Sequence, residues 1–181
     1  PSRAMLADAL AQYLVWKRWK EWFLVAGKTP EDKAFSDAVK RSAKRFGAKI
    51  VAEKPWTFDA GARRTDSGHH SAQTEIPTFT QGEDYDVLVV ADEADEFGEY
   101  LSHRTSLPRP VAGTQGLVPA IWHRSNEQWG ATQFHNRFER MFAVRMTPRD
   151  YGAWAAVRTI GEAATRTKSK DVKKLRDYVL R

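Results

Sequence analysis

The sequence predicts an α/β protein with a three-layer α-β-α architecture, in which helices cover both faces of a mainly parallel sheet and C-terminal helices follow. Candidate helices and strands alternate along residues 1–113, as is typical of parallel strands joined by helical crossovers. The run Val87–Val90 is apolar throughout, as expected of a strand that is covered on both faces. No strand is expected after Gly116, so the chain should continue in helices alone.

Local signals place two helices and two strands in the first part of the chain. Ser2 is a suitable N-cap for a helix whose apolar residues recur every three or four positions. Gly27 ends a short aromatic and aliphatic run that has the length of a buried strand. Pro30 suits the first turn of the next helix, and Gly47 suits its C-terminal cap. The expected elements are a helix over 3–19, a strand over 21–26, a helix over 30–46 and a strand over 49–53.

The middle of the chain continues this alternation after a polar loop. Pro77 weakens the helical pattern that precedes the buried run. Phe97, Tyr100 and Leu101 recur at helical spacing after the run, which predicts another helix. The expected elements are a loop over 55–70, an irregular helix over 71–81, a strand over 86–91, a helix over 93–104 and a strand over 110–113.

The C-terminal part of the chain is expected to be helical only. Thr147 followed by Pro148 is a typical cap and first-turn pair at a helix start. After a connecting stretch over 117–124, helices are expected over 125–143, 148–165 and 169–180. The sequence therefore predicts an alternating α/β domain over residues 1–119 and a connecting and helical part over residues 120–181.

Composition excludes several classes of protein. The chain has no cysteine, which excludes a disulfide scaffold, a zinc–thiolate site and a thiol nucleophile. No apolar run reaches the roughly 20 residues that a membrane-spanning helix needs. The formal net charge is +6, but the Lys and Arg residues are scattered, and residues 65–100 carry ten acidic side chains and no Lys or Arg. The densest basic cluster, at residues 168–176, is expected to be a solvated helix face, and nucleic acid is not an expected partner.

Motifs for catalysis are absent, and two groups of residues leave a metal site open as an alternative. The sequence contains no dinucleotide fingerprint, phosphate loop, Gly-x-Ser-x-Gly elbow or His-Glu-x-x-His motif. Asp66, His69 and His70 are expected to form a polar loop, because adjacent side chains on an extended segment point to opposite faces. Five acids between Asp92 and Glu99 are expected to form a solvated helix start, with a hard-cation site as the alternative.

Two groups of tryptophans also allow two interpretations. Trp16, Trp19 and Trp22 lie among basic residues, and such a pattern can stack nucleic-acid bases. Packing between a helix and the sheet is the preferred interpretation of these three. Trp122 and Trp129 flank the connecting stretch and are candidates to line a cleft.

The candidate binding site follows from the position of the strand ends. In open parallel sheets, ligands bind beyond the carboxyl ends of the strands. Gly27 and Gly113 allow the backbone to turn closely at two of these ends. Turns after strands also need glycine and polar residues for structural reasons alone, so both interpretations stay open. The polar side chains expected to contact a ligand are Thr29, Asp92, Glu93, Thr114 and Gln115.

The order of the elements resembles the second lobe of type I periplasmic binding proteins, which include the branched-chain amino acid receptors of ABC transporters. The segments that carry this resemblance are Trp22–Ala26, Phe46–Val51, Asp86–Ala91 and Val111–Gly113, followed by Met146–Pro148 and Tyr151–Ala156. A narrower resemblance is to the subgroup associated with pyrroloquinoline quinone-dependent alcohol oxidation systems. The segments that carry it are Asp59–Gly68, Tyr85–Glu93 and Arg109–Val118. Branched-chain receptors have a Tyr-Gly turn after the first strand of this lobe, where this chain has Thr29–Asp32.

The resemblance implies a solute-binding component of an ABC transporter. Such a protein is periplasmic and two-lobed, closes on a small molecule and delivers it to a membrane permease, without catalysis and without a cofactor. It implies that residues 1–119 are the second lobe and that residues 120–181 return toward a first lobe, so that this chain is the C-terminal half. Helices that lack their sheet are expected to pack back on this lobe or to exchange between chains, which would favour a homodimer.

A metal-binding role is the alternative function. Quinone-dependent alcohol dehydrogenase systems use calcium or lanthanide ions, and the acids from Asp92 to Glu99 would then bind the ion. For the solute-binding role, half a cleft should bind weakly, because about half of the contacts are missing while the ordering cost remains. We therefore expect no measurable calorimetric affinity of this chain for leucine, isoleucine or valine.

Overall fold

The computed structural model describes residues 1–56 and 76–180 of the 181-residue chain. The chain divides into two compact units, Pro1–Pro119 and Ala120–Arg181. Residues 57–70 of the predicted loop, residues 71–75 of the helix predicted over 71–81, and the group of Asp66, His69 and His70 lie outside the described residues.

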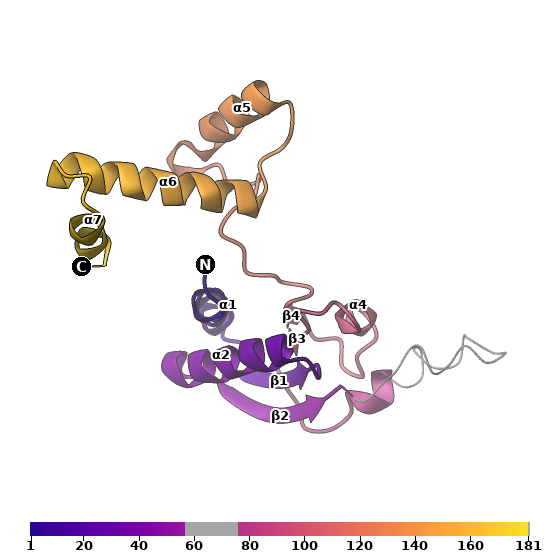
Figure 1. Ribbon diagram of the computed structural model, residues 1–181. Helices are drawn as coiled ribbons and strands as arrows, with labels where there is room; N and C mark the ends of the chain where they lie inside the picture. The colour runs from indigo at the N-terminus through magenta and orange to yellow at the C-terminus, as the bar shows by residue number, and fades with distance from the viewer. Residues whose placement is uncertain (57–75, 181) are drawn as a thin grey trace. The chain divides into compact units, whose positions relative to one another are not determined.

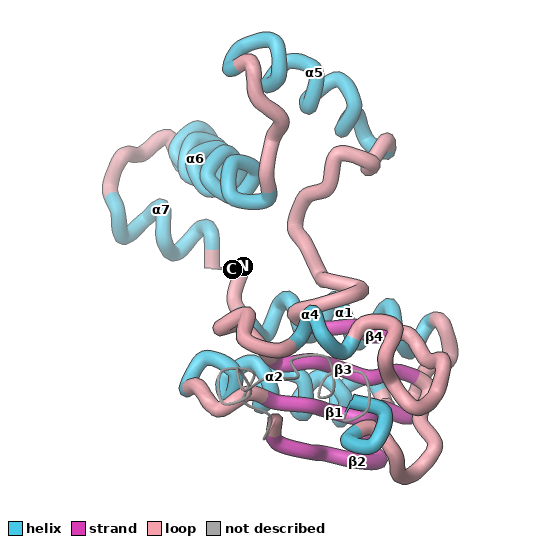
Figure 2. The backbone as a smooth tube through the Cα atoms, turned by 90° about the vertical axis from the view of Figure 1, so that its right-hand side faces the viewer, coloured by secondary structure: helices cyan, strands magenta, loops and turns pink. Residues whose placement is uncertain are grey.

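The first unit is built on a four-stranded parallel sheet. Its strands are β1 (Glu21–Ala26), β2 (Lys49–Pro55), β3 (Val87–Ala91) and β4 (Val111–Gly113), in the order β2-β1-β3-β4 (Figure 2). Every pair of neighbouring strands is parallel, and one register shift occurs between β1 and β2 at Trp22 and Phe23. The predicted α/β fold with a parallel sheet is confirmed, and all four predicted strands are present.

Two helices cover one face of this sheet (Figure 1). They are α1 (Arg3–Trp16) and α2 (Pro30–Phe46). Helix α2 begins with a capping box between Thr29 and Asp32 and ends at Gly47, whose φ of 77° suits a left-handed cap. Alternate strand residues pack under these helices, because successive side chains of a strand point to opposite faces. The buried residues on this face include Leu10, Leu14, Trp22, Leu24, Phe35, Val39, Val87 and Val89.

The opposite face of the sheet is covered by shorter elements. Helix α4 (Gly98–Leu101) and a helical turn at residues 76–79 lie over it. The intervening strand residues point to this side, as the two-residue period of a strand requires. The buried residues on this face are Phe23, Val25, Trp56, Ile76, Tyr85, Leu88, Val90, Phe97 and Leu101. The first unit is therefore a three-layer α-β-α domain, as the sequence predicts.

Two predicted helices of the first unit are shorter in the structure. The helix predicted over 3–19 ends at Trp16, because Arg18 adopts a left-handed φ of 66° and the amide of Trp19 bonds back to the carbonyl of Leu14. The helix predicted over 93–104 is wrong for most of its length. Only Gly98–Leu101 is helical, because the Asp92 carboxylate binds the amides that would begin a helix earlier.

The three N-terminal tryptophans have different environments. Trp22 is buried in the sheet core, and Trp19 packs partly buried against it, as the packing interpretation predicts. Trp16 is 71% exposed, so the prediction that it packs between helix and sheet is wrong. Its ring contacts Tyr13 and lies 4.8 Å from the Lys17 ammonium.

The second unit is helical within its described residues. Its elements are the 3₁₀ turn η2 (Gln128–Gly130) and the helices α5 (Ala131–Phe142), α6 (Pro148–Thr167) and α7 (Val172–Val179). The helix predicted over 125–143 starts later, because Trp129 and Gly130 adopt left-handed φ values of 51° and 78°. Thr147 and Asp150 form the capping box of α6, where Thr147 and Pro148 predict a helix start.

A small aromatic core holds the second unit together. Trp122 stacks on Tyr151 with ring centroids 5.0 Å apart, and Phe134 contacts both rings edge-on. Ala131 and Met146 complete the buried cluster. Trp122 is 6% exposed and Trp129 is 95% exposed, so the two do not line a common cleft as predicted. Trp122 is a core residue of this unit.

The second unit exposes many large apolar side chains. On α6, Trp154, Val157 and Ile160 recur at three-residue steps and are 38%, 71% and 57% exposed. Comparable exposure occurs at Met141, Phe142, Val172, Val179 and Leu180. This density of exposed apolar residues is unusual for a complete soluble domain and is typical of a surface that another element covers.

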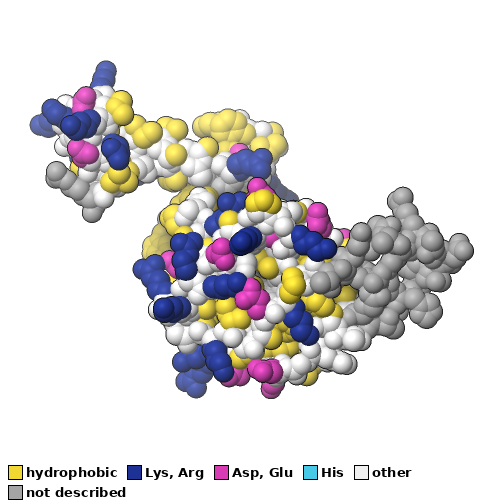
Figure 3. Space-filling view, turned by 60° about the horizontal axis from the view of Figure 1, so that its bottom comes forward, with side chains coloured by type: hydrophobic (Ala, Val, Ile, Leu, Met, Phe, Trp, Pro, Cys, Tyr) yellow, Lys and Arg dark blue, Asp and Glu magenta, His cyan; other side chains and the backbone are white. Residues whose placement is uncertain are grey.

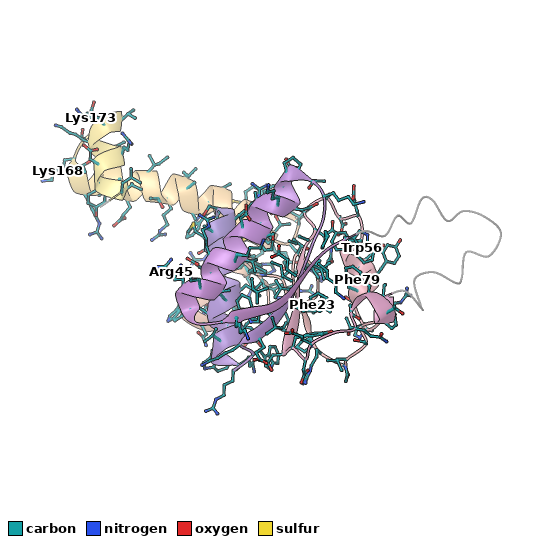
Figure 4. The ribbon with its side chains drawn as sticks, turned by 90° about the horizontal axis from the view of Figure 1, so that it is seen from below. Phe23, Arg45, Trp56, Phe79, Lys168 and Lys173 are labelled. Atoms are coloured by element: carbon teal, nitrogen blue, oxygen red, sulfur yellow. The ribbon has the colours of Figure 1, made fainter. Side chains whose placement is uncertain are left out.

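Charged side chains form no continuous basic surface on the face shown in Figure 3, where Lys and Arg alternate with Asp and Glu. The basic cluster at residues 168–176 is exposed, and Lys168 and Lys173 lie on the outside of α7 and the turn before it (Figure 4). This agrees with the prediction of a solvated helix face.

Candidate functional site

Three strand ends of the first unit meet at one edge of the sheet. Strands β1 and β3 end in register, with Ala26 opposite Ala91, and Val90 of β3 is opposite Gly113 of β4. The segments at these ends are residues 27–32, 92–98 and 113–116, which include the first residues of α2 and α4 and the last residue of β4. We call these three segments the rim turns, and together the rim. All five predicted contact residues, Thr29, Asp92, Glu93, Thr114 and Gln115, lie in the rim.

The first rim turn is organised by Asp32. One carboxylate oxygen, Oδ2, accepts the amide of Thr29 at 3.0 Å, and the Thr29 hydroxyl accepts the amide of Asp32 at 3.1 Å. The other oxygen, Oδ1, accepts the amides of Glu93 and Ala94 at 2.7 and 3.3 Å. Asp32 therefore connects the first rim turn with the second. It is absent from the predicted contact residues, although the spacing Thr29-x-x-Asp32 is a readable capping signal.

The second rim turn wraps around Asp92. This carboxylate is 2% exposed and accepts the amides of Glu96, Phe97 and Gly98 at 3.0, 2.9 and 2.6 Å. The amide of Asp92 itself donates to the Thr114 hydroxyl at 3.0 Å. The carboxylate of Asp92 is therefore directed into the protein, and its observed contacts are structural.

Thr114 has its hydroxyl group occupied in both directions. The oxygen accepts the Asp92 amide and the hydroxyl donates to the carbonyl of Val90 at 3.3 Å. This hydroxyl connects the third rim turn with the second and with strand β3. Of the five predicted contact residues, Asp92 is buried, Thr29, Thr114 and Gln115 are partly exposed, and Glu93 is exposed.

Glu93 and Gln115 each have a polar partner at the rim. The guanidinium of Arg3, at the start of α1, donates to both oxygens of Glu93 at 2.6–2.9 Å. This ion pair raises the pKa of Arg3 through its hydrogen bond and charge interaction with Glu93. Gln115 donates from Nε2 to the carboxylate of Asp95 at 2.6 Å. Arg3 is 90 residues from Glu93 in the sequence, so no local sequence pattern indicates this pair.

Concave surfaces border the sheet at two places. A pocket of about 580 Å³ lies between the start of α1 and the rim, and Arg3, Arg41 and Glu93 are among its lining residues. A second pocket, of about 700 Å³, lies beside the start of β4, where His103, Thr105 and Arg109 contribute to its wall. Glu93 lines the first pocket and Gly116 lines the second, so each pocket borders one rim turn, but only the first is lined by a predicted contact residue.

Aromatic side chains support the rim from below. Trp56 follows the end of β2 and stacks on Phe97 with ring centroids 4.6 Å apart and planes 8° apart. Phe79 contacts Trp56 edge-on at 5.3 Å, as the side chains in Figure 4 show. Phe97 also lies against Gly27, where a Cβ would come within 3.1 Å of its ring. The rim thus rests on a packed apolar layer.

The described part of the chain contains no cluster of side chains suited to bind a metal ion. Among residues 1–56 and 76–180, no group of three or more His, Asp or Glu side chains could hold a metal ion. Three acids of the second rim turn have partners in the protein: Asp92 accepts backbone amides, Glu93 pairs with Arg3, and Asp95 accepts a hydrogen bond from Gln115. In the same described residues, no helix combines the length and the apolar character needed to cross a membrane.

The ion pair beside the second pocket provides a test of the surface electrostatics. Arg109 donates to both oxygens of Asp84 at 3.0 and 3.3 Å, and this hydrogen bonding holds the pKa of Asp84 below its ordinary value. A lowered folded-state pKa contributes stability above the unfolded pKa, and this contribution is lost as the pH falls through the folded pKa. We expect Arg109→Ala to raise the pKa of Asp84 in an NMR titration of its carboxyl group.

Asp150 serves as the internal control in that titration. Its pKa is lowered by hydrogen bonds from Thr147 in the second unit and should not change in Arg109→Ala. An unchanged Asp84 titration in the variant would show that Arg109 does not set this pKa.

Comparison with known proteins supports the fold. No protein-family model matches the sequence, and no curated protein matches it. Solved structures do match. An ABC transporter substrate-binding protein from Desulfitobacterium hafniense in complex with Leu aligns with a TM-score of 0.64 at 15% identity, over 98% of this chain and 55% of that chain. The chain has the fold of one lobe of a periplasmic binding protein.

Other solved structures match at similarly low identity and over a similar share of their length. A leucine-binding protein from Thermotoga maritima aligns with a TM-score of 0.57 at 11% identity, over 98% of this chain and 54% of that chain. A solute-binding protein of an ABC transporter from R. palustris in complex with benzoate aligns with a TM-score of 0.56 at 13% identity, over 96% and 51%. The chain thus spans about half the length of the solved structures that it matches.

Proposed function

We propose that this chain is one half of a solute receptor of an ABC transporter, and that the rim binds a small organic molecule without chemical conversion. The observation that carries the proposal is the meeting of three turns with partly exposed polar side chains at the carboxyl ends of a parallel sheet. This is where ligands bind in open α/β sheets. The fold that the chain shares with solute-binding proteins supports the same role.

The rim offers polar side chains on turns that hydrogen bonds within the protein hold in place. Among the predicted contact residues, Glu93 is exposed, and Thr29, Thr114 and Gln115 are partly exposed. The Thr114 hydroxyl already has a donor and an acceptor as partners, so Thr29, Glu93 and Gln115 are the residues that we propose contact a solute. Asp92 and Thr114 are proposed to hold the rim turns in place through their hydrogen bonds, without contacting the solute. The pocket of about 580 Å³ that borders Glu93 provides a concave margin for a small molecule.

The second unit has a separate role in this proposal. We propose that its helices pack over the sheet of a first lobe, which would supply the other side of the cleft. The exposed Trp154, Val157 and Ile160 on α6 support this, because an apolar helix face needs an apolar surface to cover it. The alternative is a homodimer through the same helices. Analytical ultracentrifugation distinguishes the two: a monomeric mass supports packing on a first lobe, and a dimeric mass supports the homodimer.

The sequence segments support a more specific assignment. We propose that the receptor is periplasmic, delivers its solute to a membrane permease, and belongs with quinone-dependent alcohol oxidation systems. Tyr85–Glu93 and Arg109–Val118 carry this assignment, and both segments border the rim. The third segment, Asp59–Gly68, lies outside the described residues.

An NMR titration of the 181-residue chain tests the binding role. Leucine and benzoate, the compounds named for two of the matched structures, are added separately up to about 10 mM, a range suited to the weak affinity of half a cleft. We expect amide shifts to be confined to the rim turns, around Thr29, Glu93 and Gln115, for at least one compound.

The same titration contains outcomes that contradict the proposal. Shifts confined to residues 102–109, on the wall of the pocket beside β4 that lies outside the rim, would argue against solute binding at the rim. The absence of shifts with either compound would argue against it as well. In parallel, calorimetry should detect no affinity of the chain for leucine, isoleucine or valine. Micromolar binding would contradict the view that the rim is only half of a site.

A further inference from the structure

Two carboxylates lie beneath the rim surface and face inward. Asp32 is 0% exposed and Asp92 is 2% exposed. Together they accept hydrogen bonds from six backbone amides at distances of 2.6–3.3 Å. Hydrogen bonds to an ionised carboxylate are stronger than those between neutral groups, so each carboxylate can fix the conformation of the backbone around it.

These hydrogen bonds run between turns as well as within them. Asp32 belongs to the first turn and binds the amides of Glu93 and Ala94 in the second. The amide of Asp92 in the second turn donates to the hydroxyl of Thr114 in the third. A continuous chain of hydrogen bonds therefore links all three turns.

Two glycines make room for the two carboxylates. A Cβ at Gly27 would overlap the carboxylate of Asp32, and a Cβ at Gly98 would overlap the Gln115 side chain and lie 3.1 Å from Oδ2 of Asp92. Neither glycine has a positive φ, so backbone conformation alone does not require glycine there. The Asp32 carboxylate thus fits a space that only glycine at position 27 leaves open, and the Asp92 carboxylate would be in tight contact with a Cβ at position 98.

We propose that Asp32 and Asp92 are positioning residues that couple the three rim turns into one preformed surface. In this arrangement Thr29, Glu93 and Gln115 keep their mutual positions before a solute binds. The inference rests on the proposed function of the rim as a solute site. Preformed contact groups reduce the ordering cost of binding, so the coupling would contribute directly to affinity in a two-lobed receptor.

Hydrogen exchange of backbone amides, followed by NMR on the 181-residue chain, tests the coupling. In Asp32→Ala, we expect the amides of Glu93 and Ala94 to exchange about tenfold faster, because they lose their acceptor. If the rim is one unit, the amides of Glu96 and Gly98, which bond to Asp92 and not to Asp32, exchange faster as well.

Matched variants separate coupling from a general loss of stability. Asp37→Ala changes an exposed acid on the same helix and should leave the rim amides unchanged. The buried amides of Leu24 and Val89 report the stability of the whole unit and should keep their exchange rates in Asp32→Ala. Asp32→Asn keeps one acceptor oxygen, so it should restore protection of Glu93 and Ala94 relative to Asp32→Ala.

One result would overturn the proposal. If Asp32→Ala accelerates exchange only at its direct partners, the turns are independent and the carboxylates are local caps. Should Asp32→Ala fail to fold, Thr114→Val replaces it, because it removes only the hydroxyl that links the second and third turns. The same coupling criterion then applies to Glu93 and Ala94, which Thr114 does not contact.

This experiment is independent of solute binding. It contains no ligand, so an absence of coupling would leave the proposed binding role untouched. Conversely, coupled turns in a chain that shows no rim shifts with leucine or benzoate would contradict the binding role and not the coupling.

Discussion

Replacing Gly113 with alanine is expected to lower the free energy of unfolding of the first unit by about 3 kcal/mol or more. Gly113 has a φ of 112°, which L-residues with a side chain rarely adopt. A Cβ there would overlap the backbone oxygen of Val90 and lie 2.9 Å from the Val90 nitrogen. Both atoms belong to the central strand β3, so the clash can be relieved only by separating β4 from the sheet.

Gly47→Ala is the matched control for this substitution. Gly47 also has a positive φ, of 77°, but a Cβ there would meet no heavy atom within 4 Å. Only the left-handed backbone strain remains, which amounts to about 1–2 kcal/mol. Hydrogen exchange of the β1 and β3 amides measures the unfolding free energy of the first unit in each variant. Equal losses in the two variants would show that the contact between Gly113 and Val90 contributes nothing.

The strands of the first unit were predictable because their signals are local. Val87–Val90 is apolar on both faces in the sequence and completely buried in the structure. The helix start at Pro30 and the cap at Gly47 were also predictable, because capping depends on residues within one turn of the helix end. The parallel direction of the strands follows from their alternation with helices, whereas the order β2-β1-β3-β4 is a finding of the structure, because residues 56–86 carry the chain from β2 past β1 to β3.

The helix predicted over 93–104 shows that helical spacing of apolar residues alone does not determine a helix. Phe97 and Leu101 have helical spacing, but both are buried against the sheet from a turn and a single short helix. Burial of this pair requires only that both side chains face the sheet, and a turn can achieve this as well as a helix. The deciding interaction is the Asp92 carboxylate, whose hydrogen bonds reach residues up to six positions ahead.

The location of the candidate site was predictable, and the roles of its residues were not. Parallel strands must end at one edge, so Thr29, Glu93 and Gln115 had to lie near each other. The partners that determine their exposure are far away in the sequence. Asp32 is 61 residues from Glu93, and Arg3 is 90 residues from it, so no local pattern connects them.

Phe97→Ala is expected to lower the free energy of unfolding of the first unit by about 3–5 kcal/mol, as for other buried phenylalanines. The Phe97 side chain is 1% exposed and stacks on Trp56. Its amide hydrogen bond to Asp92 involves the backbone, so truncation of the ring removes packing and keeps this bond. The cavity would open directly beneath the first and second rim turns, beside Gly27.

Trp16→Ala is the control, because it deletes a larger aromatic ring that is 71% exposed in the same unit. Surface substitutions of this kind change stability by about 0.5 kcal/mol or less. The unfolding free energies of the two variants are measured by denaturant titration, with hydrogen exchange of the β3 amides as the probe of the first unit. If Phe97→Ala also loses only this small amount, the aromatic layer does not support the rim. If the large loss is observed and Phe97→Leu recovers part of it, packing beneath the turns stabilises the surface on which the proposed binding site depends.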